Sequence, residues 1–151
     1  MKMTASLATT KNETREYINR IISYLEIKYE IPVIFERDAD TALYHEGRKL
    51  INGDFIIINN RVKLEKQLYM LLHEAGHVLL REDEYEHERR FPAAEAKRGK
   101  AFIVDVLREE VLAWEAGRDM ARNFDIPIDN KLWNSMVTSA LSKYIKWSNN
   151  A

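Results

Sequence analysis

The sequence contains no cysteine among its 151 residues, so disulfide bonds, thiolate metal sites and cysteine catalysis are excluded. Its 23 basic and 24 acidic side chains nearly balance, which argues against nucleic acid binding driven by bulk charge. No apolar run approaches the length of about 18 residues that a membrane helix needs, and the first residues lack the apolar core of a signal peptide. We therefore expect a cytoplasmic protein with no direct nucleic acid binding and no membrane contact.

Hydrophobic residues make up 46% of the chain and charged residues 31%, proportions typical of a globular protein with a buried core. The length suits one domain, so we expect residues 1–151 to form a single domain. Within it, we expect residues 1–9 to be disordered and residues 131–151 to form a C-terminal helix and tail.

The first half of the chain predicts one helix and a small sheet. Thr10 and Glu13 have the spacing of a capping box, and apolar residues recur at helical spacing from there to about Tyr29. Three short apolar or β-branched segments follow and predict strands joined in antiparallel pairs, at 31–36, 42–44 and 55–58.

The second half predicts helices. Residues 61–80 predict a long helix with its N-cap at Asn59 and Asn60, residues 100–123 a second, and a last helix is capped by Asp129. We interpret the acidic segment 82–88 as a solvated loop or helix end. The order of a helix, a small sheet and then further helices indicates an α+β fold.

One cluster in the predicted helix 61–80 carries chemistry, the H-E-x-x-H pattern of His73, Glu74 and His77. Residues four apart lie on one face of a helix, so both imidazoles can converge on one metal ion. Zinc suits two neutral imidazoles and a third protein ligand, because a fourth position then remains for water. Glu74 would take the proton from that water and pass it to the leaving amine.

A third ligand must come from elsewhere in the chain. Glu110 is the one charged member of an otherwise apolar or small stripe on the helix 100–123, so we predict that it completes the site. Glu109 on the neighbouring stripe is the runner-up, and His87 is a further alternative. Glu115 falls among polar residues and is interpreted as solvated.

Other residues leave alternatives open. Gly76 either allows close approach of another element to the metal helix or is a tolerated substitution. Tyr85, His87 and His45 are weak candidates for stabilising an oxyanion. The C-terminal segment 141–151, with Tyr144 and Trp147 at helical spacing, either packs on the core or covers the cleft of a latent enzyme.

The succession of a helix, three short strands, an H-E-x-G-H helix and a later Glu-containing helix resembles the ImmA/IrrE-type zinc peptidases, a compact gluzincin group. The likeness extends over roughly residues 13–125 and is firmest at LLHEAGHVLL, residues 71–80. Residues 110–114 resemble the family's Glu-x-x-Ala-Asn segment, with Trp114 standing where Asn is usual.

This resemblance implies a gluzincin-like fold in which His73, His77 and Glu110 bind Zn²⁺ and Glu74 is the general acid and base. It also implies a protein or peptide substrate lying extended along an edge strand, with a regulatory or repressor protein as one class. We therefore predict a zinc-dependent endopeptidase. The alternatives are a zinc-stabilised protein-binding module that hydrolyses nothing, and a metal-free interaction protein with two core histidines.

Overall fold

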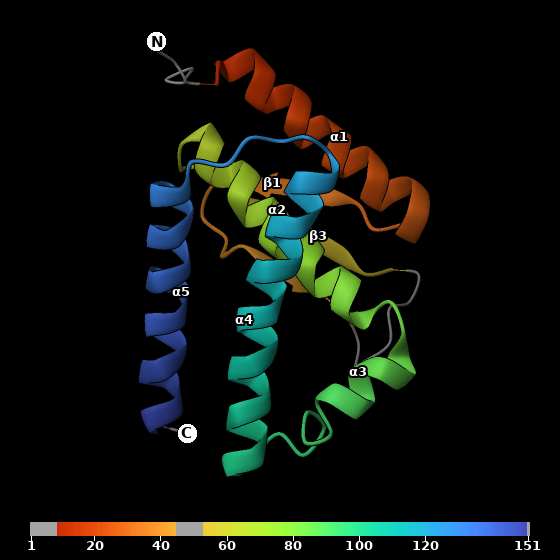
Figure 1. The fold of residues 1–151 in the computed structure, drawn as a ribbon, viewed down its shortest axis with the longest axis vertical. Helices are drawn as coiled ribbons and strands as arrows, with labels where there is room; N and C mark the ends of the chain where they lie inside the picture. The colour runs from red at the N-terminus through yellow and green to blue at the C-terminus, as the bar shows by residue number, and fades with distance from the viewer. Residues whose placement is uncertain (1–8, 45–52, 151) are drawn as a thin grey trace.

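The computed structural model describes residues 9–44 and 53–150, so most of the segment predicted to be disordered lies outside the described residues. The fold is α+β, as predicted, with helices surrounding a small three-stranded sheet (Figure 1). The elements in chain order are α1 (Lys11–Tyr29), β1 (Val33–Glu36), β2 (Ala42–Tyr44), β3 (Phe55–Asn59), α2 (Leu64–Arg81), α3 (Glu84–Arg90), α4 (Lys100–Asn123) and α5 (Asn130–Asn150).

Helix α1 begins with the predicted capping box. The hydroxyl of Thr10 accepts from the backbone N–H of Glu13, and the Glu13 carboxylate accepts from the N–H of Thr10. One face of the helix buries Ile18, Ile21 and Leu25 in the core. Helix α1 therefore forms one side of the core, where it packs against α2 (Figure 1).

The sheet has the order β1-β3-β2. The predicted antiparallel pairing is confirmed for β2 with β3, but it is wrong for β1, which runs parallel to β3. Strand β3 lies between the other two strands, so β1 pairs with β3 and not with β2, its neighbour in the chain. Strand β3 buries Ile56 and Ile58, while β2 remains at an edge of the sheet.

Helices α2 and α4 approach each other closely and cross in front of the sheet (Figure 1). A Cβ atom built on Gly76 of α2 would lie 1.9 Å from the carbonyl oxygen of Ala113. One built on Gly117 of α4 would lie 2.4 Å from the carbonyl oxygen of Leu72. The close-approach interpretation of Gly76 is therefore confirmed.

The beginning of α2 differs from the prediction. The helix starts at Leu64 after Lys63, so the predicted N-cap at Asn59 and Asn60 is wrong. The side chain of Asn59 instead accepts a hydrogen bond from the backbone N–H of Arg61 and forms a local turn. This short-range alternative is available to Asn and competes with helix capping.

The acidic segment folds into the short helix α3, capped by Asp83, whose side chain accepts from the N–H of Glu86. Helix α5 is capped by Asp129 as predicted, and it lies alongside α4 (Figure 1). The structure describes all of α5, in which Trp133 is the one buried residue. Among the described residues, no helix combines the length and the apolar character needed to cross a membrane.

Candidate metal centre

His73 and His77 lie one turn apart on α2, and their ring centroids are 4.8 Å from each other. The apolar residues around them, such as Leu71, Leu72 and Ala75, are fully buried, so this stretch of α2 runs through the core. The two imidazoles point from this helix toward α4. The pattern predicted from the sequence therefore presents both rings on one face.

Glu110 of α4 faces both imidazoles. Its Oε1 atom lies 2.8 Å from Nε2 of His73, and its Oε2 atom lies 3.2 Å from Nε2 of His77. One ligand atom from each of the three residues falls within 4.8 Å of the others. Glu110 is only 2% exposed, which agrees with the prediction that this carboxylate points into the interior.

The neighbouring residue Glu109 is also buried, but it contacts the other side of one imidazole. Its Oε2 atom lies 2.8 Å from Nδ1 of His77, whereas the carboxylate of α4 that faces His73 is that of Glu110. The remaining partners of Glu109 are His87 and Arg81. The two candidate carboxylates therefore occupy different places around His77, and the exposed Glu115 is solvated as predicted.

The residues present suit a metal ion. Two imidazole nitrogens and a carboxylate oxygen are the donor set that zinc takes in three-ligand catalytic sites. Nε2 of His73 is buried and, within the described ranges, is not aligned for any hydrogen bond, although Glu110 is close. The indole of Trp114 stacks on the His73 ring at 4.1 Å between centroids and restrains its plane.

The electrostatics of the cluster hold the imidazoles charged when no metal is bound. Desolvation would lower the pKa of His77, but hydrogen bonds with Glu109 and Glu110 outweigh it and raise this pKa to about 10. Burial would raise the pKa of Glu110, but the two imidazoles outweigh it and lower this pKa to about 2. A metal ion must therefore replace protons that the site otherwise retains.

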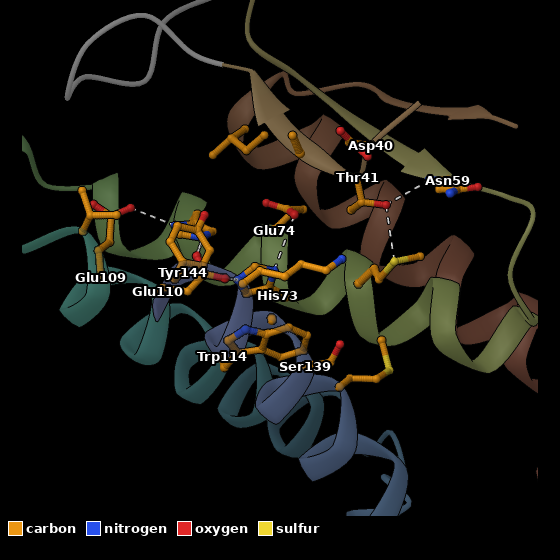
Figure 2. Close-up of a pocket in the computed structure, with 18 of the residues that line it drawn as sticks. Asp40, Thr41, Asn59, His73, Glu74, Glu109, Glu110, Trp114, Ser139 and Tyr144 are labelled. Carbon is orange, nitrogen blue, oxygen red and sulfur yellow. Dashed lines mark hydrogen bonds and ion pairs between the residues drawn. The ribbon is translucent and has the colours of Figure 1, made fainter. Parts of the chain in front are cut away.

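The cluster opens onto a cavity of about 910 Å³, whose walls come from β2, α2, α4 and α5. Glu74 lines this cavity next to His73, with its Oε2 atom 3.5 Å from Nδ1 of that ring. Figure 2 shows Glu74 on the side of the cavity near Thr41, and Tyr144 beside Glu110. Glu74 can therefore reach a molecule held in the cavity.

Of the predicted oxyanion candidates, the two that the structure describes, Tyr85 and His87, do not line this cavity. Tyr85 is 72% exposed and lies outside its lining, whereas His87 is fully buried against Glu109. His45 lies outside the described residues. A solvated charge run was predicted for the segment containing His87, and the structure differs because α3 turns this side chain inward.

Tyr144 of α5 is a cavity residue that the sequence did not single out for this role. Its pKa is raised by burial first and then by the nearby carboxylates of Glu110 and Glu74, so the phenol stays protonated. Its helical spacing with Trp147 predicted either packing on the core or a cover over the cleft, and did not indicate a role in the reaction. Its position beside Glu110 of α4, which lies 34 residues earlier in the chain, depends on the tertiary fold.

Comparison with known proteins gives a family. The family model described as IrrE N-terminal-like domain, a peptidase family, matches residues 27–106, which is more than half of the chain. No similar chain was found among the curated proteins or among the solved structures. The resemblance inferred from the sequence is thus confirmed, and the chain belongs to the IrrE N-terminal-like family of metallopeptidases.

Proposed function

We propose that this protein is a zinc-dependent endopeptidase that hydrolyses a peptide bond of a protein substrate. One observation carries the proposal: two imidazoles and a carboxylate converge within 4.8 Å beside Glu74, at the wall of a large cavity. A purely structural metal site has no need of a carboxylate next to its open position, so the arrangement favours an enzyme over a binding module.

His73, His77 and Glu110 would hold the metal. Zinc is the metal that best suits this set, because three protein ligands complete a tetrahedron with one position left for water. When bound, the ion supplies a Lewis acid that lowers the pKa of water to about 7. The stacked indole of Trp114 keeps the His73 ring oriented for this task.

Glu74 moves the proton. A carboxylate oxygen of Glu74 accepts a proton from the attacking water while the new C–O bond forms at the scissile carbonyl carbon. The same group then donates this proton to the leaving amide nitrogen as the C–N bond breaks. Its position at the cavity wall, with Oε2 3.5 Å from Nδ1 of His73, is consistent with this role.

Tyr144 can stabilise the developing oxyanion. Because its phenol stays protonated among carboxylates, it can donate a hydrogen bond to a substrate oxygen in the cavity. We assign this role to Tyr144 in place of Tyr85 and His87, since Tyr144 is the tyrosine that lines the cavity within the described part of the chain.

The substrate would lie along β2. This strand contributes Ala42 and Leu43 to the cavity lining, and among the described strands it pairs with β3 alone. An extended peptide can add to such an edge through main-chain hydrogen bonds. The resemblance to ImmA/IrrE-type peptidases favours a regulatory or repressor protein as the substrate class.

The first experiment measures metal content. Full-length protein purified without chelator is expected to contain about one zinc per chain by elemental analysis, and His73→Ala is expected to lose it. Glu115→Gln, which changes an exposed glutamate of α4, is the matched control and should retain zinc. A wild-type chain that takes up no zinc would remove the peptidase proposal.

The second experiment separates hydrolysis from binding. Zinc-loaded wild type and Glu74→Gln are incubated with a peptide library prepared from a whole proteome, and new termini are identified by mass spectrometry. We expect cleavage by the wild type, and a Glu74→Gln variant that keeps zinc but cleaves at least 100-fold more slowly. Zinc binding without any cleavage by the wild type would instead support the binding module.

A further inference from the structure

Glu109 stands at the centre of a buried network that the proposed reaction does not use. Both of its carboxylate oxygens are engaged, because Oε2 lies 2.8 Å from Nδ1 of His77 and Oε1 lies 2.5 Å from Nε2 of His87. Nη2 of Arg81 donates to the same carboxylate at 2.9 and 3.2 Å. Glu109 is only 7% exposed, so these contacts compensate for burying its charge.

The two nitrogens of the His77 ring face two different carboxylates. Nε2 of this ring faces Glu110 and Nδ1 faces Glu109, so the imidazole is held between two carboxylates of consecutive residues. When Nδ1–H donates to a carboxylate, the lone pair is left on Nε2, the atom that faces the candidate metal position. The network therefore selects the tautomer and the ring orientation that metal binding needs.

His87 secures the carboxylate from the opposite side. It belongs to α3, has no exposed surface and packs against Phe91 at 5.0 Å between ring centroids. A fully buried histidine in a segment as acidic as 82–88 needs a specific partner, and Glu109 supplies it. The acidic segment 82–88 thus supplies a buried imidazole, and Glu109 lies between this ring and that of His77.

We propose that Glu109, held by Arg81 and His87, is a positioning residue that orients His77 for metal binding and extends the metal centre into α3. Glu109 acts through His77 and does not itself bind the metal. The inference rests on the proposed metal site, and it assigns distinct roles to two neighbouring glutamates.

The test is the zinc affinity of the full-length chain, measured by competition with a chromophoric chelator. Glu109→Gln is expected to weaken zinc binding about 10- to 100-fold, and Glu110→Gln is expected to weaken it more. His87→Gln should weaken it by a smaller factor. Glu115→Gln is the matched control on α4 and should bind as tightly as the wild type.

A double variant tests whether the residues act together. If His87 acts only through Glu109, then Glu109→Gln with His87→Gln should bind zinc no more weakly than Glu109→Gln alone. If the losses of zinc affinity in the two single variants multiply in the double variant, the residues act independently and the network is overturned. Circular dichroism of each metal-free variant checks that the fold is retained.

A further variant is tested by the absorption spectrum of a bound metal ion, which reports the geometry of the site separately from its affinity. Arg81→Lys keeps the positive charge but replaces the planar guanidinium, whose Nη2 contacts both oxygens of Glu109, with a shorter ammonium group, and Co²⁺ replaces Zn²⁺ as the probe. We expect the visible absorption of bound Co²⁺ to shift in Arg81→Lys and to stay unchanged in Glu115→Gln. An unchanged spectrum and unchanged affinity would overturn the inference, whereas failure of the wild type to bind either metal would overturn the proposed function itself.

Discussion

Helix α4 packs against two partners in very different ways. Against α2 the two backbones touch, because Gly76 and Gly117 remove the side chains that would separate the helices. Against α5 aromatic side chains make contact, Trp114 with Trp133 and Phe102 with Trp147, and Trp133 is the one residue of α5 that is buried. The candidate metal ligands come from the first pair, whereas α5 contributes a wall of the cavity.

The two kinds of helix contact suit two different requirements of the site, which are to hold the candidate metal ligands and to line the cavity. A chelating geometry must be held within a fraction of an ångström, and a backbone-to-backbone contact between two helices provides that rigidity. The wall must accommodate a substrate, and α5 is anchored at one end by Trp133, whose indole contacts the rings of Tyr69 and Trp114 at 5.2 Å each. Farther along, Ile145 is 54% exposed.

The largest expected effect follows from breaking the rigid contact. Gly76→Ala places a methyl group 1.9 Å from the backbone oxygen of Ala113, so α2 and α4 must move apart. We expect a loss of about 3 kcal/mol in the free energy of unfolding, measured by urea denaturation, although alanine is otherwise the better helix former by about 1 kcal/mol. A stabilised Gly76→Ala would show that the two helices are not held this closely. Glu115→Ala on the exposed face of α4 should change stability by less than about 0.5 kcal/mol.

A smaller effect is expected from acid, because the ion pairs of the site also join α2 to α4. In the metal-free chain the pKa of Glu110 is lowered to about 2 from its ordinary value of 4.5, since the imidazoles outweigh the burial that would raise it. The unfolded chain therefore binds the proton first, and stability from Glu110 is present above pH 4.5 and is lost as pH falls toward 2. Denaturation of metal-free protein at pH 6, 4 and 3 should show this decline, with a shallower slope for Glu110→Gln. Equal slopes for the wild type and Glu110→Gln would mean that the ion pairs of Glu110 contribute nothing to stability.

Changes in α5 should affect activity and leave the metal in place. Tyr144→Phe removes one hydroxyl from the wall, so we expect kcat to fall about 100-fold while zinc content and stability stay at wild-type values. The measurement is cleavage of a peptide identified in the library experiment. Unchanged kcat would remove Tyr144 from the reaction.

Removing the C-terminal half of α5 should lower activity no more than Tyr144→Phe does. A chain ending at Ser139 should stay folded and keep zinc, because it retains Trp133 and the α2–α4 contact. Since it lacks Tyr144, we expect its activity to fall as in Tyr144→Phe. A rise in activity would instead support the hypothesis that the segment 141–151 covers the cleft of a latent enzyme.

Local patterns predicted the parts of this protein that depend on local contacts. The capping box of α1, the capping of α5 by Asp129, the extent of α4 and the three strands were all read from spacing and composition. The pairing of β1 was predicted incorrectly, because β3 lies between β1 and β2, so that β1 pairs with a strand that is not its neighbour in the chain. The N-cap of α2 was also misplaced, because Asn59 forms a turn of its own.

The sequence by itself determined that His73, Glu74 and His77 share a helix, since the spacing of four residues brings the two imidazoles to one face whatever surrounds it. Only the tertiary structure decided that Glu110 faces both Nε2 atoms, that Glu109 faces Nδ1 of His77, and that a buried His87 completes its contacts. The physical reason is the rotation and distance of α4 relative to α2. These are set by the contact at Gly76, between residues more than thirty positions apart, and no local periodicity encodes them.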